Sequence, residues 1–185
     1  MNIDVKPIYR AGIIAVIIPV AAFLGSWLTG SMLMLDYIHV LLGAIWTGVD
    51  VFYGLIFYFV ISTMGPEGRS NISIRLIPMS LFFIPAASIL TPLAGYILAV
   101  KEGIFSIHSD AFIAAIILGT ILVLVGFLTI VLSSAIILKD ILSGSIDQEK
   151  NSRLLMFGSR GALVQLIFQI AIISVMAYIV VFITS

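Results

Sequence analysis

Long apolar runs separated by short polar links dominate the hydropathy pattern of this chain. A helix needs about 20 mostly apolar residues to cross a bilayer, and five runs meet that requirement: residues 9–29, 35–62, 76–100, 111–138 and 161–183. None of them shows the long apolar–polar alternation of a membrane β-strand. The pattern therefore predicts an all-α, polytopic membrane bundle of five transmembrane helices, forming one domain over residues 1–185.

The composition agrees with a membrane protein and excludes several classes of function. Hydrophobic residues make up 62% of the 185 residues and charged residues only 10%, whereas a soluble domain is about half apolar and a quarter charged. The formal net charge of zero offers no basic field to nucleic acid. The absence of cysteine excludes disulfides, iron–sulfur clusters and thiol catalysis. The lipid bilayer is the expected partner, and nucleic acid is not.

Basic residues are distributed unequally between the two ends of the predicted bundle. Lys101 is the only one on the outer side if the N-terminus lies inside. The inner side then carries Lys6, Arg10, Arg69, Arg75, Lys139, Lys150, Arg153 and Arg160. Because basic residues concentrate on the cytoplasmic side, the sequence predicts an inner N-terminus, an outer C-terminus and a location in the cell (plasma) membrane. The polar link 139–152 is predicted to be the most mobile segment.

Two regular spacings predict how helices pack. Pro78, Pro85 and Pro92 lie seven residues apart and should bend the third helix. A broken helix that exposes carbonyl groups to an ion is the functional alternative. Gly119 and Gly126 belong to a second such series, which permits close helix approach.

One face of the second helix is too polar to lie against lipid. Its members are spaced three or four residues apart, which keeps them on one side of a helix: Asp36, His39, Gly43, Trp46, Asp50 and Tyr53. At ~1.5 Å per residue, Asp50 lies about 16 Å deeper than His39, near the membrane midplane. A carboxylate there costs roughly 2.5–3.5 kcal/mol, so Asp50 is expected to be protonated or paired.

Two glutamines of the fifth helix extend this polar set. Gln169 should reach the depth of Asp50, where its amide can donate to a carboxyl oxygen. The set of Asp50, Tyr53, Gln165 and Gln169 has two interpretations. It is either an interhelical hydrogen-bond clamp or a proton-relay or ion site.

His39 has three interpretations, of which the first is a purely structural histidine. The second is haem ligation, because Gly43 leaves room for a macrocycle and Trp46 offers a flat apolar wall. His108 or Met176 would then supply a second axial ligand, or the second axial position would stay open.

The third interpretation of His39 is a site for a single copper, zinc or iron ion. Asp36 lies three residues before His39, and His108 and Asp110 lie in the facing outer link. Two imidazoles and two carboxylates suit these metals. Asp110 would alternatively cap the fourth helix.

The stretch His39-Val-Leu-Leu-Gly-Ala-Ile-Trp46-Thr-Gly48 reads H-x6-W-x-G. It resembles the first signature helix of CopD-like copper-resistance proteins, HemJ-like protoporphyrinogen oxidases and a related family of uncharacterised predicted integral membrane proteins. The resemblance covers the second helix only. It implies a four-helix core with a b-type haem or copper, in which His39 is the haem ligand and Trp46 and Gly48 pack around it. HemJ-like proteins also use a lysine in a later helix, and Lys101 does not align with it securely, so oxidase activity is not carried over.

These observations predict an integral membrane protein that binds haem b and transfers electrons, an oxidoreductase function in the broad sense. Whether it is an enzyme is left open. The first alternative is a protein that transports protons, ions or a solute and uses Asp50. The second is a non-catalytic accessory subunit that associates with other membrane subunits or with further copies of itself.

Overall fold

A computed structural model describes residues 6–183, with side chains at all of these positions except 6–9, 11 and 78–80. Every regular element in this range is helical, and no strand occurs in it. In chain order the elements are α1 (Lys6–Thr29), α2 (Met32–Asp50), η1 (Val51–Phe57), α3 (Tyr58–Ser62), α4 (Pro66–Lys101), α5 (Asp110–Gly126), η2 (Phe127–Val131), α6 (Leu132–Ser143) and α7 (Gln148–Phe182). The predicted all-α fold is confirmed.

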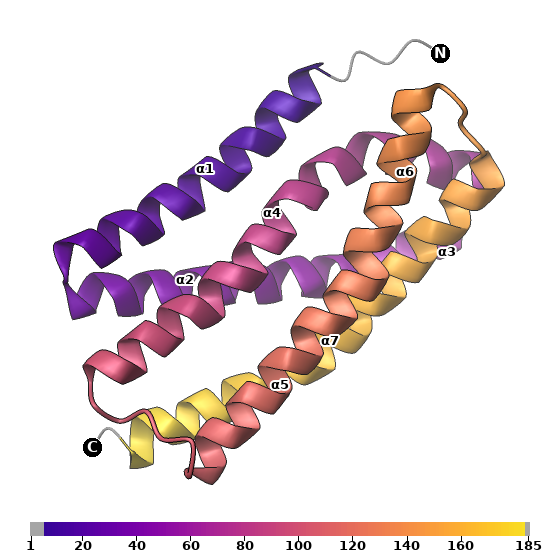
Figure 1. The fold of residues 1–185 in the computed structure, drawn as a ribbon. Coiled ribbons are helices and arrows are strands. Elements are labelled where there is room, and N and C mark those ends of the chain that lie inside the picture. The colour runs from indigo at the N-terminus through magenta and orange to yellow at the C-terminus, as the bar shows by residue number, and fades with distance from the viewer. Residues whose placement is uncertain (1–5, 184–185) are drawn as a thin grey trace.

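The elements combine into five helical stretches that are long and apolar enough to cross a membrane. They are Gly12–Thr29, Met32–Ser62, Leu81–Lys101, Asp110–Ser143 and Gln148–Phe182. Successive stretches alternate in direction, so the two chain ends lie at opposite ends of the bundle (Figure 1). In the most apolar 18 residues of each stretch, only 17 to 28% are buried. The remaining surface is largely isoleucine, leucine, valine and phenylalanine, and it suits contact with lipid.

The two ends of the bundle differ in charge, and we name them accordingly. The basic end holds the α3–α4 and α6–α7 links together with Arg69, Arg75, Lys139, Lys150 and Arg153. The opposite end holds the α1–α2 and α4–α5 links and carries Lys101.

Several helices extend further at the basic end than hydropathy predicts. α4 begins at Pro66 rather than at residue 76, α6 continues to Ser143, and α7 begins at Gln148 rather than at residue 161. At ~1.5 Å per residue, the 36 residues of α4 span about 54 Å, whereas a hydrocarbon core is about 30 Å thick. The hydropathy criterion finds only the part of a helix that lipid surrounds, and these extensions are too polar to be detected by it.

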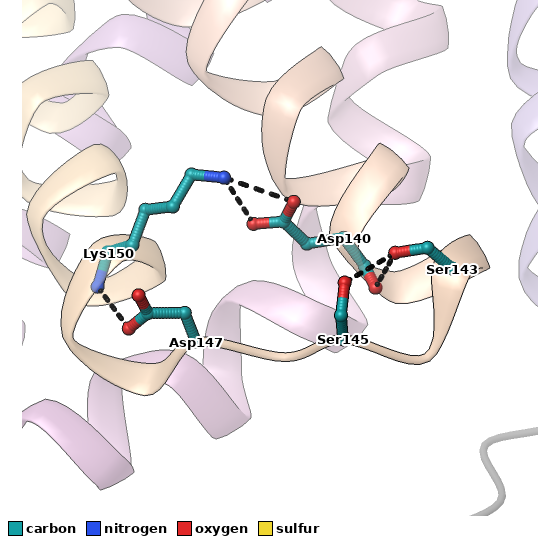
Figure 2. Close-up of polar contacts among 5 residues, drawn as sticks. All are labelled: Asp140, Ser143, Ser145, Asp147 and Lys150. Atoms are coloured by element: carbon teal, nitrogen blue, oxygen red, sulfur yellow. Dashed lines mark hydrogen bonds and ion pairs between the residues drawn. The ribbon is translucent and has the colours of Figure 1, made fainter.

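The α6–α7 link, predicted to be mobile over residues 139–152, is mostly helical and is held by side chains (Figure 2). Lys150 Nζ lies 2.8 Å from Asp140 Oδ2 and 3.1 Å from Oδ1. The Asp147 carboxylate caps α7 by accepting a hydrogen bond from the Lys150 backbone N–H at 3.0 Å. Ser143 and Ser145 share a hydroxyl–hydroxyl bond of 2.7 Å. These contacts join the last turn of α6 to the first turn of α7.

The proline-rich α4 is one continuous helix, and Figure 1 shows it bent near its first third. The continuity through Pro78, Pro85 and Pro92 corrects the alternative of a broken helix. The bend lets α4 pack against α1 and α2 toward the opposite end and against α6 and α7 toward the basic end.

Candidate functional site

Asp50, the last residue of α2, is fully buried at 0% exposure and meets α7 at Gln169, which is 2% exposed. Gln169 Nε2 donates to Asp50 Oδ2 at 2.8 Å, which confirms the contact predicted from matched depth. The other two oxygens of the pair, Asp50 Oδ1 and Gln169 Oε1, have no hydrogen-bond partner among the described residues. Both are acceptors, so the pair lacks a donor. An unsatisfied buried polar group costs about 1–3 kcal/mol.

Gln165 lies one helical turn from Gln169 and ties α7 to α5. Its Nε2 donates to the Leu122 carbonyl at 2.8 Å, and its side chain is 1% exposed. The amide lies directly against Gly126, where a Cβ atom would collide with it. The predicted close approach along the small-residue series is therefore present at Gly126, and it accommodates a polar side chain.

Two π-helical segments contact α7 just to the basic-end side of this polar set. η1 begins directly after Asp50, and η2 begins directly after Gly126. A Cβ atom on Gly54 of η1 would lie 2.6 Å from Leu163 N and 2.7 Å from Leu163 Cα, so the two backbones touch there. At Gly161 the contact is of another kind, because the side chain of Thr129 from η2 occupies the space where a Cβ atom would lie. Short π-helical segments occur frequently at functional sites.

Tyr53, the next polar residue of the predicted face, lies within η1 and is partly buried. Its ring meets that of Phe57 edge to face, with 5.4 Å between centroids. Arg160, the cation of α7 nearest in sequence to Gln165, stands 6.0 Å over the Tyr58 ring, away from Asp50. Asp140–Lys150 is the one ion pair recorded between residues 6 and 183, so no described cation neutralises Asp50.

Trp46 lies one turn from Asp50, toward the opposite end of the bundle. It is 6% exposed and belongs to an apolar cluster that we call the Trp46 layer: Trp46, Ala87, Leu122, Phe83, Phe168 and Ile172. The layer joins α2, α4, α5 and α7. Asp50 is therefore closed off by apolar side chains on that side.

His39 joins α2 to α4. Its Nδ1 lies 2.8 Å from the Thr91 carbonyl oxygen. That oxygen can only accept, so Nδ1 carries a proton, and the neutral form of the ring has its lone pair on Nε2. The ring rests on Gly95, where a Cβ atom would lie 2.6 Å from His39 Cε1. A Cβ atom on Gly43 would similarly lie 3.4 Å from the Thr91 methyl group. This face of α2 is packed closely on α4.

The arrangement around His39 does not fit a haem held within one chain. The space that Gly43 was predicted to leave for a macrocycle faces Thr91. Trp46, which was predicted to be the apolar wall of a haem site, packs instead against the other side chains of the Trp46 layer. Of the predicted second ligands, His108 is exposed in the α4–α5 link, and Met176 packs on the cluster of Ala99, Phe112 and Ile179.

The predicted metal ligands are likewise dispersed. Asp36 and His108 are exposed, and no group of three or more His, Asp or Glu side chains able to hold a metal is found in the described part of the chain. Asp110 stands in the first turn of α5, and Ser109 takes the N-cap position predicted for it.

No protein-family model, curated protein or solved structure matches this chain. The resemblance of the H-x6-W-x-G helix to CopD-like and HemJ-like proteins thus rests on that motif alone.

Proposed function

We propose that this chain is a membrane protein that handles protons, with Asp50 as the residue that binds and releases the proton. One observation carries the proposal: Asp50 Oδ1 and Gln169 Oε1 are buried acceptors without a donor. A proton on Asp50 Oδ1 supplies the donor that the pair lacks. It also removes a charge that costs roughly 2.5–3.5 kcal/mol in a bilayer.

The same contact has a simpler interpretation, which is an interhelical clamp. A clamp needs only the hydrogen bond from Gln169 Nε2 to one carboxyl oxygen. The unpaired acceptors and the absence of a described cation favour a protonated Asp50, and the adjoining π-helical segment η1 favours a functional role over a clamp.

The charge distribution supports a cytoplasmic location for the basic end, with the chain in the plasma membrane. Protons would then reach Asp50 from the cytoplasm, or leave Asp50 for the cytoplasm. This orientation is part of the proposal and follows from the basic residues alone.

Asp50→Asn tests the proposal directly. In infrared difference spectra of the purified protein at neutral pH, we expect the wild type to show a protonated-carboxyl C=O band that Asp50→Asn removes. The amide variant keeps an oxygen for Gln169, so a clamp would survive. Asp36→Asn is the matched control, since Asp36 is an exposed acid on the same helix, and it should leave the band unchanged. A wild-type spectrum without that band would refute the assignment.

Haem ligation by His39 is the rival proposal, and one contact favours it. The hydrogen bond of Nδ1 to the Thr91 carbonyl leaves Nε2 free, as in many metal-binding histidines. The close packing around Gly43 and Trp46 is evidence against haem ligation. Protein purified from haem-replete cells should therefore show no Soret band. A Soret band that disappears in His39→Ala and persists in His108→Ala would replace proton handling with a redox function.

A further inference from the structure

A small hollow with a mixed apolar and polar lining lies on the basic-end side of Asp50. The hollow has a volume of about 10 Å³, and its polar lining residues are Tyr53, Ser133, Ser134 and Ser159. That volume is about the room that one water molecule needs. Ser159 is 1% exposed, and its hydroxyl has no hydrogen-bond partner among the described residues. The hollow is therefore polar enough and large enough to hold a water.

The hollow lies between Asp50 and the basic end. Ser159 precedes Gln169 by ten residues of α7, which places it about 15 Å closer to the basic end. Tyr53 lies three residues after Asp50 and lines the same hollow. One lining residue is thus a helical turn from the acid.

More buried polar groups without partners occur beyond the hollow. Asn151 in the first turns of α7 and Ser70 in the first turns of α4 are both 0% exposed. Within the described part of the chain, neither the Asn151 amide atoms nor the Ser70 hydroxyl finds a hydrogen-bond partner. Buried polar groups in proteins are bonded to protein or to water, so these positions call for water.

The other side of Asp50 is different in character. There the Trp46 layer fills the bundle, and its single polar side-chain atom is Trp46 Nε1. Two polar atoms on that side, Trp46 Nε1 and beyond it Thr91 Oγ1, are also buried without a partner among the described residues, but they lie among apolar clusters. The polar groups on the basic-end side of Asp50 differ in that several of them line a hollow.

We infer that a hydrated half-path connects the basic end to Asp50, passing Asn151 and Ser70, then the hollow at Ser159 and finally Tyr53. The inference rests on the proton-handling role of Asp50. When the acid releases its proton, the proton passes from the carboxyl oxygen to a water, and the resulting hydronium hands it on toward the basic end. Proton binding is the reverse.

Ser159→Val tests this path because it fills the hollow and removes its unpartnered hydroxyl. The readout is the rate at which the Asp50 carboxyl band shifts after rapid mixing with D2O. We expect the band to remain and its exchange to slow by about tenfold, the effect of one lost hydrogen bond on a rate. Ser174→Val is the matched control, because Ser174 is exposed on the same helix and bonds to its own backbone, and its exchange rate should equal that of the wild type.

The outcomes separate this inference from the proposed function. An unchanged exchange rate in Ser159→Val overturns the path and leaves Asp50 as the proton-binding group. A wild-type protein without the carboxyl band overturns the proposed function itself. Should Ser159→Val fail to fold, Ser133→Val blocks the same hollow from α6 and is expected to slow exchange equally.

Discussion

Gly54→Ala is expected to destabilise the folded bundle by about 3 kcal/mol or more, the upper range for overpacking a well-packed site. The added Cβ atom would lie 2.6 Å from Leu163 N, 2.7 Å from Leu163 Cα and 3.0 Å from Ala162 C. These are backbone atoms, so no side chain can turn aside to make room. η1 and α7 would have to separate, and the residue directly before η1, Asp50, makes its contact with Gln169 of the same α7.

Thermal unfolding in detergent, followed by circular dichroism, measures this effect. Gly48→Ala is the matched control, because Gly48 lies on the preceding turns of α2 with nothing within 4 Å of its added Cβ atom. Alanine is favoured over glycine in a helix by about 1 kcal/mol, so the control should be neutral or slightly stabilised. Equal melting temperatures for the two variants would contradict the close backbone contact.

Trp46→Ala is expected to make the protein leak protons. Truncating a buried aromatic side chain leaves a cavity and costs about 3–5 kcal/mol. Here the cavity would open in the Trp46 layer, one turn from Asp50. Water entering it would extend the half-path past Asp50 toward the opposite end of the bundle. In vesicles loaded with a pH-sensitive dye and driven by a membrane potential, proton entry should exceed that of the wild type by about tenfold or more.

Two further variants define the origin of such a leak. Phe57→Ala removes a buried ring from the basic-end cluster, where no seal is proposed, so it should leave the vesicles tight despite a comparable packing loss. Combining Asp50→Asn with Trp46→Ala should abolish the leak, because the cavity then lacks its proton-binding residue. Tight vesicles containing a folded Trp46→Ala protein would argue against the Trp46 layer as the barrier.

The membrane-spanning helices and the depth of their polar residues were predictable. The thickness of the bilayer sets the length of each apolar run, and helical rise sets the depth of each residue along it. Helical rise alone brings Asp50 level with Gln169, and the structure has that contact. The surroundings of His39 were not predictable, since they depend on how α4 is rotated about its axis. Only the folded bundle shows that Thr91 and Gly95 fill the space beside the imidazole.

The sequence did not predict the hollow at Ser159, or the buried polar groups between it and the basic end, for two reasons. Residues around Ser70 and Asn151 were assigned to links, because a hydropathy window does not detect polar helices beyond the lipid. The π-helical segments leave no recognisable periodicity in so short a stretch. A signal was nonetheless present: Asn151, Ser159 and Gln169 fall at helical spacing on one side of α7, and all three are buried.

The helical hairpin that ends in α7 is held together by different kinds of contact at the two ends of the bundle. At the basic end the Asp140–Lys150 ion pair and the capped link hold α6 to α7 through directional bonds. At the opposite end α5 and α7 meet through the apolar contact of Phe112 with Ile179, which can slide. The directional bonds of this hairpin are therefore concentrated at the basic end, whereas apolar packing joins the helices at the opposite end.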